Sequence, residues 1–121
     1  MRLRIDTVTI LLFAVLLCPA AGVHAHAVVT GSSLHDQPVK PHAAIQVLLR
    51  FNSGIEVALS RVFLVSKGDV YQPLTIRAGA KPGQLLIDLP PLAEGDYALK
   101  YRVLAADGHL TESVIRFHVA R

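Results

Sequence analysis

Histidine is the residue type in this chain best suited to chemistry. The chain has six histidines among 121 residues, and five of them lie after residue 25. His26 stands out because a cut after Ala25 would give it a free α-amine beside its imidazole. These two nitrogens can form a chelate on one metal ion, and Cu(II) favours nitrogen donors in a tetragonal plane. The alternative is that His26 merely follows a cleavage site and is solvated, as terminal residues usually are.

A second group of donors lies at Asp107-Gly108-His109. In a roughly extended segment, residues at i and i+2 project to the same side, so a carboxylate and an imidazole would converge there. Together with the amine and imidazole of His26 they make a set of three nitrogens and one oxygen, which suits Cu(II). Asp-Gly is also a strong turn dipeptide, so the alternative is an ordinary exposed turn. The two interpretations are compatible.

The remaining histidines are weaker candidates. His35 and His42 flank a proline-bearing connector and are expected to be solvent-exposed bystanders, with weak extra metal binding as the alternative. His118 falls on the polar face of a predicted strand. Soft ligands are scarce, because the single methionine is Met1 and the single cysteine is Cys18. A Cu(I) site built from thioether or thiolate groups is therefore not expected after residue 25.

The first 25 residues have the three-part layout of a secretory signal peptide. Arg2 and Arg4 provide a positive start, an apolar run occupies 8–18, and Val23-His24-Ala25 offers suitable residues at positions −3 and −1. A membrane anchor is the alternative, but the run is shorter than the about 20 residues that cross a bilayer. We expect residues 1–25 to be removed on export to the periplasm. No stable membrane anchor would then remain, and the mature chain would begin at His26.

Residues 26–121 have the patterns of β-strands and of no convincing helix. Apolar and polar residues alternate along 45–51 and 97–103, the period of a half-buried strand. The connector at 105–110 would place Asp107 and His109 at one end of the sheets. The chain is expected to form one all-β domain, an antiparallel, immunoglobulin-like β-sandwich. The seven expected strands lie near 27–33, 45–51, 62–65, 74–76, 85–89, 97–103 and 115–119.

Tyr97 has two interpretations. Gly95-Asp96-Tyr97 at the entry to a strand resembles the tyrosine corner of immunoglobulin-like sandwiches. The alternative is that Tyr97 is simply a core aromatic residue.

Charge and motifs argue against two classes of function. Residues 26–121 carry ten Lys or Arg and eight Asp or Glu, a formal balance of 10 − 8 = +2, with the basic residues scattered. Nucleic-acid binding is therefore not expected. The chain also lacks a nucleophile elbow, a Gly-rich phosphate loop, HExxH and CxxC, so no enzymatic activity is expected.

Five segments together resemble the CopC family of periplasmic copper-binding proteins. They are His26-Ala27-Val28-Val29, Leu49-Arg50-Phe51, Gly95 to Val103, Ala106-Asp107-Gly108-His109 and Ile115-Arg116-Phe117. The resemblance covers nearly all of residues 26–121.

The resemblance implies a seven-stranded Greek-key sandwich, or cupredoxin-like barrel, that binds one Cu(II) ion per chain. Its ligands would be the His26 amine, the His26 side chain, Asp107 and His109. The resemblance also implies a role in copper resistance or copper uptake, beside a CopD-like inner-membrane protein.

The sequence departs from the family pattern in three places. There is no Met-rich second site. Asn52-Ser53-Gly54 stands where some members have a carboxylate, and Glu56 is the nearest acid. Leu34 stands in place of the usual proline after the first strand. None of these departures touches the proposed donors.

The leading hypothesis is a Cu(II) carrier or buffer. The alternative is a non-metal, immunoglobulin-like interaction module of the cell envelope, which recognises another exported protein through its loops or an edge strand. A third reading, an oxidative copper enzyme with an amino-terminal histidine, is disfavoured because a chain with no tryptophan has little to offer a glycan.

Overall fold

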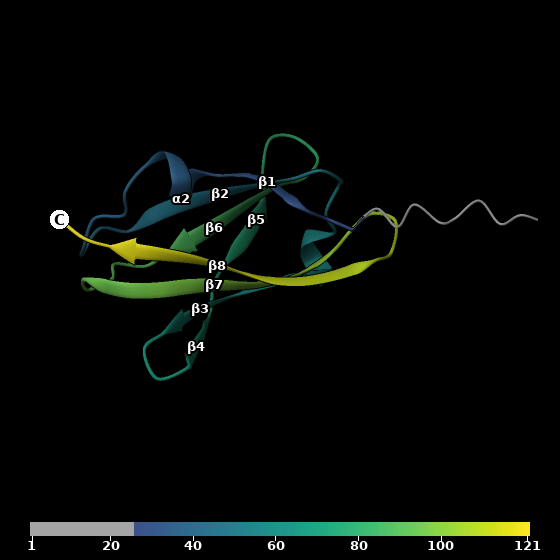
Figure 1. Ribbon diagram of the computed structural model, residues 1–121. Helices are drawn as coiled ribbons and strands as arrows, with labels where there is room; N and C mark the ends of the chain where they lie inside the picture. The colour runs from purple at the N-terminus through teal and green to yellow at the C-terminus, as the bar shows by residue number, and fades with distance from the viewer. Residues whose placement is uncertain (1–25) are drawn as a thin grey trace, which may run out of the picture.

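The computed structural model describes residues 26–121, which form two stacked antiparallel sheets of four strands each (Figure 1). The predicted signal peptide, residues 1–25, lies outside the described residues. The first sheet has the order β1 (Val29–Ser32), β2 (Ile45–Phe51), β6 (Gln84–Leu89) and β5 (Ile76–Ala78). The second sheet has the order β4 (Val70–Pro73), β3 (Arg61–Ser66), β7 (Gly95–Leu104) and β8 (Leu110–Val119).

The predicted fold class, an all-β antiparallel sandwich, is confirmed. Strands β2 and β6 pair with each other, as do β3 and β7, although each pair is far apart in sequence. These are the long-range antiparallel pairings of a Greek-key sandwich. Each sheet therefore draws its strands from both halves of the described chain.

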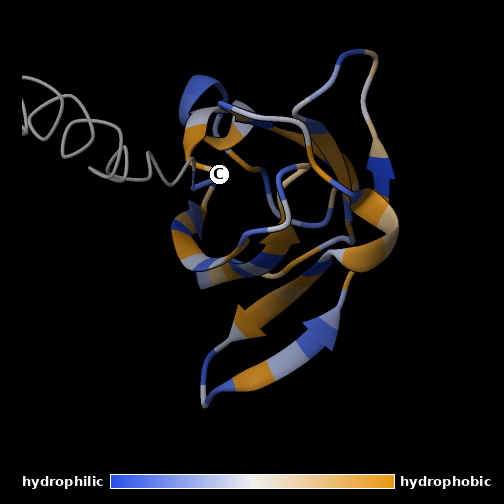
Figure 2. Cartoon of the chain, turned by 90° about the vertical axis from the view of Figure 1, so that its right-hand side faces the viewer, coloured by the Kyte–Doolittle hydropathy of each residue, from blue (hydrophilic) through white to orange (hydrophobic). Residues whose placement is uncertain are grey.

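The predicted number of strands is wrong, because the described residues form eight strands and not seven. The missed strand is β4, which forms a hairpin with β3 that extends away from the rest of the sandwich (Figures 1 and 2). All four of its residues are exposed, so the sequence shows no alternation there. The short strand predicted at 74–76 is β5, displaced two residues along the chain.

Helical structure in the described residues is limited to two single turns. These are α2 (Ser33–Asp36) and a 3₁₀ turn at Val57–Leu59. Within residues 26–121, therefore, no helix has the length and hydrophobicity needed to cross a bilayer.

The core lies between the two sheets and follows the alternation seen in the sequence. Val47 and Leu49 of β2 face Leu99 and Val103 of β7, and all four side chains are fully buried. Figure 2 shows hydrophobic residues on both sheets. Burial of each such side chain contributes about 1.5–3 kcal/mol, so the core holds the two sheets as one frame.

Tyr97 forms the tyrosine corner that the sequence suggested as one of two interpretations. Its hydroxyl donates a hydrogen bond of 2.9 Å to the carbonyl oxygen of Ala93, four residues upstream. Its ring stacks on Phe117 of β8, with 5.8 Å between centroids. This corner fixes the start of β7, whose other end leads to Asp107.

Candidate metal centre

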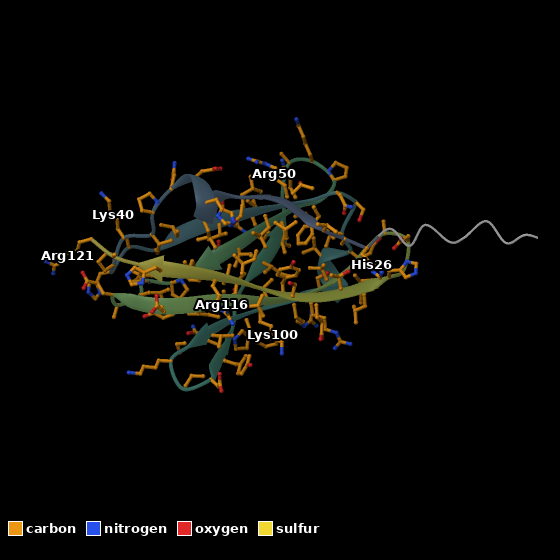
Figure 3. The ribbon with its side chains drawn as sticks, viewed as in Figure 1. His26, Lys40, Arg50, Lys100, Arg116 and Arg121 are labelled. Atoms are coloured by element: carbon orange, nitrogen blue, oxygen red, sulfur yellow. The ribbon has the colours of Figure 1, made fainter. Side chains whose placement is uncertain are left out.

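The residues predicted to bind metal lie at one end of the sandwich, beside the turn that joins β7 to β8. Figure 3 shows His26 at this end. The centroids of the His26 and His109 rings are 6.0 Å apart, and the ring planes make an angle of 66°. The fold therefore brings together two imidazoles from segments that are far apart in sequence.

The β7–β8 turn explains how Asp107 and His109 converge. The Ala105 N–H donates to the His109 carbonyl oxygen at 2.8 Å, and the Gly108 N–H donates to the Ala105 carbonyl oxygen at 2.9 Å. Gly108 has a φ of +92°, a region that favours glycine. The turn interpretation of Asp-Gly is thus confirmed, and the same turn brings the carboxylate beside the imidazole.

Asp107 contacts His109 through both carboxylate oxygens. Oδ1 accepts a hydrogen bond of 3.0 Å from the His109 backbone N–H, and Oδ2 lies 3.1 Å from the His109 ring Nδ1. The backbone N–H first, and then the His109 ring, hold the pKa of Asp107 below its ordinary value. The carboxylate is therefore ionised at neutral pH. The side chains of His109 and Asp107 are 43% and 38% exposed, whereas the His109 Nδ1 atom itself is buried.

One segment ties the amino-terminal arm to this turn. The Asn52 side-chain oxygen accepts a hydrogen bond of 2.8 Å from the Val28 N–H, and the Asn52 N–H donates to the Val28 carbonyl oxygen at 3.0 Å. Two residues later, the Gly54 carbonyl oxygen accepts a bond of 2.9 Å from the Ala106 N–H. We call residues 52–56 the bridging segment. It holds the residues next to His26 close to the residues next to Asp107.

Asn52 is a structural residue of this end that the sequence analysis missed. It was considered only because it replaces a carboxylate of the family pattern. Asparagine commonly bonds to backbone groups in loops, and its position directly after β2 was the available signal. Its partner, Val28, is 24 residues away in sequence, and local pattern does not identify a partner at that distance.

Two imidazoles and a carboxylate lie near one another here but do not form a complete metal-binding site. Within residues 26–121, no three histidine, cysteine, aspartate or glutamate side chains are arranged closely enough to hold an ion. The fourth predicted donor, the His26 amine, is an amide nitrogen as long as Ala25 precedes it. The types of donor nevertheless fit Cu(II), which binds nitrogen and oxygen ligands.

The weaker candidates occupy other positions. His35 is exposed in α2 and His42 is exposed in the loop before β2, and both α2 and Lys40 lie toward the end opposite His26 (Figures 1 and 3). His118 is exposed, as predicted, and its Nδ1 lies 2.6 Å from an oxygen of Asp96. The Glu56 backbone N–H donates to Leu104 at 2.8 Å, whereas its side chain is exposed.

Comparison with protein families finds a match over nearly all of the described residues. The model of the CopC domain matches residues 29–120, which include Asp107 and His109. No curated protein sequence matches the chain.

Two of the solved structures similar to this chain are CopC and PcoC. One is CopC from Methylosinus trichosporium OB3b, with 33% sequence identity and a TM-score of 0.65 over 78% of this chain and 93% of the other. Another is PcoC, described as a methionine-rich copper resistance protein from Escherichia coli. It has 26% identity and a TM-score of 0.60, over 79% of this chain and all of the other.

Proposed function

The chain belongs to the CopC family, and from that premise we propose that it is a copper resistance protein that binds one Cu(II) ion. The ligands in this proposal are the His26 amine, the His26 imidazole, Asp107 and His109. The observation that carries it is the distance of 6.0 Å between the His26 and His109 rings, with Asp107 in contact with His109. These side chains come from two segments that are far apart in the sequence and meet at one end of the sandwich.

The choice of Cu(II) over Cu(I) follows from the available donors. The single methionine and the single cysteine of the chain are Met1 and Cys18, both ahead of the proposed mature start. Thioether and thiolate ligands select Cu(I), whereas imidazole, amine and carboxylate suit Cu(II). In this respect the chain differs from PcoC, which is described as methionine-rich.

The proposed role is to hold and hand over copper and not to react with it. Four protein donors would fill a tetragonal site, whereas catalytic metals usually keep a position open for substrate. The partial exposure of Asp107 and His109 is compatible with exchange of the ion with another protein. The direction of transfer, resistance or uptake, depends on the partner, for which a CopD-like inner-membrane protein is the expectation from the family.

The proposed site requires export and cleavage after Ala25. The cut would release the His26 amine, and the periplasm is where a signal peptide of this kind delivers its protein. Ala27, the next residue, is 1% exposed, and Val28 is held by Asn52. The new terminus would therefore stay anchored beside the β7–β8 turn.

A Cu(II) titration against a competing chelator tests the proposal. The protein that begins at His26 is compared with the same protein carrying one extra residue before His26, which converts the amine into an amide. Tight binding of one ion that collapses on extension is the expected result. His26→Ala and His109→Ala should each lose affinity by orders of magnitude, whereas the exposed His35→Ala should bind as tightly as the parent.

Equal, weak binding by the parent and the extended protein would contradict the proposal. His26 would then be a bystander, and the non-metal interaction module would become the better account of the chain.

A further inference from the structure

The outward side of the second sheet is both basic and apolar. On β3 and β7 the side chains of Val62, Leu64, Leu99 and Val103 are buried against the first sheet, so the alternate residues face outward. We call the resulting outward surface the basic face. It is defined by Phe63, Tyr71, Lys100, Arg102, Val114 and Arg116.

Aromatic rings and a lysine form the middle of this face. Phe63 and Tyr71 meet edge to face, with 6.5 Å between their centroids. The Lys100 Nζ lies 5.5 Å from the centroid of the Tyr71 ring, within range of a cation–π interaction. A hollow of about 340 Å³ opens between these three side chains, Arg102 and Glu112.

The basic face also exposes large apolar side chains. Tyr71 is 51% exposed and Val114 is 49% exposed. Leu110 is 44% exposed and pairs with Leu104 at the end of the same sheet. These three are half of the six exposed large hydrophobic residues found within residues 26–121. Such grouping marks a surface that contacts another molecule.

The charge of the basic face indicates what kind of molecule would contact it. Lys100, Arg102 and Arg116 project from this face, and Figure 3 shows Lys100 and Arg116 on the side where β3 and β4 lie. Glu112 is the acid beside the hollow, and it is engaged with Arg102 at 3.4 Å. By strand register, four cations (Arg61, Lys100, Arg102 and Arg116) and two acids (Asp96 and Glu112) face outward on β3, β7 and β8. This ratio exceeds the near balance of residues 26–121, which carry ten basic and eight acidic side chains. A complementary partner is therefore acidic.

We propose that the basic face docks an acidic segment of another protein, with an apolar side chain of that segment in the hollow between Phe63 and Tyr71. A protein segment is favoured over an anionic lipid surface because the cations flank a hollow within a sheet face. A lipid surface would first meet the tip of the protruding β3–β4 hairpin, where the one cation, Lys67, is offset by the one acid, Asp69.

The basic face lies close to the copper site of the proposed function, and the following point rests on that function. Leu110 directly follows His109 in sequence, so the basic face ends beside the proposed copper site. A protein docked there would have its own metal ligands within reach of the ion. Docking itself depends on the basic face and not on the copper ligands.

The test uses an array of short synthetic peptides in which Asp and Glu flank one Leu, Phe or Tyr. The protein beginning at His26 should bind a subset of these peptides, and binding should weaken as salt concentration rises. Lys100→Glu should weaken binding by about tenfold or more, because it places like charges together. Lys81→Glu, the same change in the exposed loop before β6, should have little effect. Tyr71→Ala should weaken binding of every peptide and abolish any preference among Leu, Phe and Tyr.

Three outcomes would overturn the proposal. One is equal loss in Lys100→Glu and Lys81→Glu, which would reduce the effect to net charge. Another is an absence of peptide binding at any salt concentration. The third is binding to phosphatidylglycerol vesicles that depends on Lys100 while the peptides bind weakly. Peptide binding that is kept in His109→Ala would show that the docking surface stands whether or not the copper site does.

Discussion

At the scale of single residues, Asp107 joins the backbone of the turn to the proposed site. Its Oδ1 accepts the His109 N–H at 3.0 Å and shapes the turn, while its Oδ2 lies beside the His109 ring. An asparagine could still accept the backbone hydrogen bond, but it would bring no negative charge to a cation. The substitution therefore separates the structural role of residue 107 from its role toward copper.

We predict that Asp107→Asn lowers Cu(II) affinity by at least about tenfold, because a carboxylate ligand is lost, and leaves thermal stability nearly unchanged. Chelator competition and thermal unfolding measure the two effects. The chain offers a matched control in Asp96, which contacts His118 in a second Asp–His pair. Asp96→Asn should leave copper affinity unaltered. Equal effects of the two substitutions would mean that Asp107 is not a ligand.

The pH dependence of Cu(II) binding follows from the protonation of the proposed ligands. The pKa of Asp107 is lowered by the His109 N–H and ring, so this carboxylate stays ionised as the pH falls from neutral. Protons instead compete with copper for the imidazoles and the amine.

We predict that Cu(II) affinity falls as the pH is lowered from neutral, because protons compete with the ion for the imidazole and amine nitrogens. Removal of one competing imidazole in His109→Ala should make this dependence shallower by about one proton. Asp107→Asn should weaken binding without changing the slope. The measurement is chelator competition at a series of pH values. A slope that changes with Asp107 and not with His109 would contradict the assignment.

At the scale of elements, the bridging segment connects the two parts of the proposed site. Residue 52 binds the arm before β1 through Val28, and residue 54 binds the β7–β8 turn through Ala106. Ile55 continues this contact as an isolated antiparallel bridge to Ala105. The distance between the arm and the turn is therefore set by a segment that supplies no proposed ligand.

We predict that Asn52→Ala lowers Cu(II) affinity several-fold, because the Val28 N–H loses its partner and the arm that carries His26 loosens. One hydrogen bond contributes about 0.5–1.5 kcal/mol, so the free energy of unfolding should fall by no more than about that amount. Asn52→Asp keeps the acceptor oxygen and should retain binding. Copper titration and denaturant unfolding check both effects, and a loss of stability without any loss of affinity would remove Asn52 from the positioning of the site.

The elements predicted from the sequence are those that contribute alternate residues to the core. Strand β2 was predicted with its observed bounds, since Val47, Leu49 and Phe51 are buried at every second position. Strand β4 left no such signal because none of its residues is buried. Strand β8 begins at Leu110, five residues before the predicted start at 115. The prediction missed its first half because those residues are largely exposed and show no alternation.

The candidate site was accessible to sequence reasoning for a related reason. Asp107 and His109 are two residues apart, so their convergence is a local property of one turn. His26 was identified by its place after a cleavage signal and not by its contacts. Its contact with His109 depends on the packing of two sheets, and the basic face likewise depends on the register of four strands. Neither arrangement follows from periodicity alone.

At the scale of the whole molecule, the proposed copper ion would link the two sheets. His26 precedes β1 of the first sheet, whereas Asp107 and His109 lie between β7 and β8 of the second. The core holds the sheets together over their buried faces, and the bridging segment and the ion would join them at one end. A ligand that binds the folded chain more tightly than the unfolded chain stabilises the fold by mass action.

We predict that Cu(II) raises the thermal stability of the protein that begins at His26. Free copper at about 100 times the dissociation constant should add about 2.7 kcal/mol, which corresponds to an increase in Tm of roughly 10–20 °C for a domain of this size. The protein with one extra residue before His26 should gain far less, because its amide cannot replace the amine. Differential scanning calorimetry with and without Cu(II) makes the comparison. An equal increase in both proteins would show that copper binds elsewhere, since only the cleaved terminus can join the first sheet to the second through the amine.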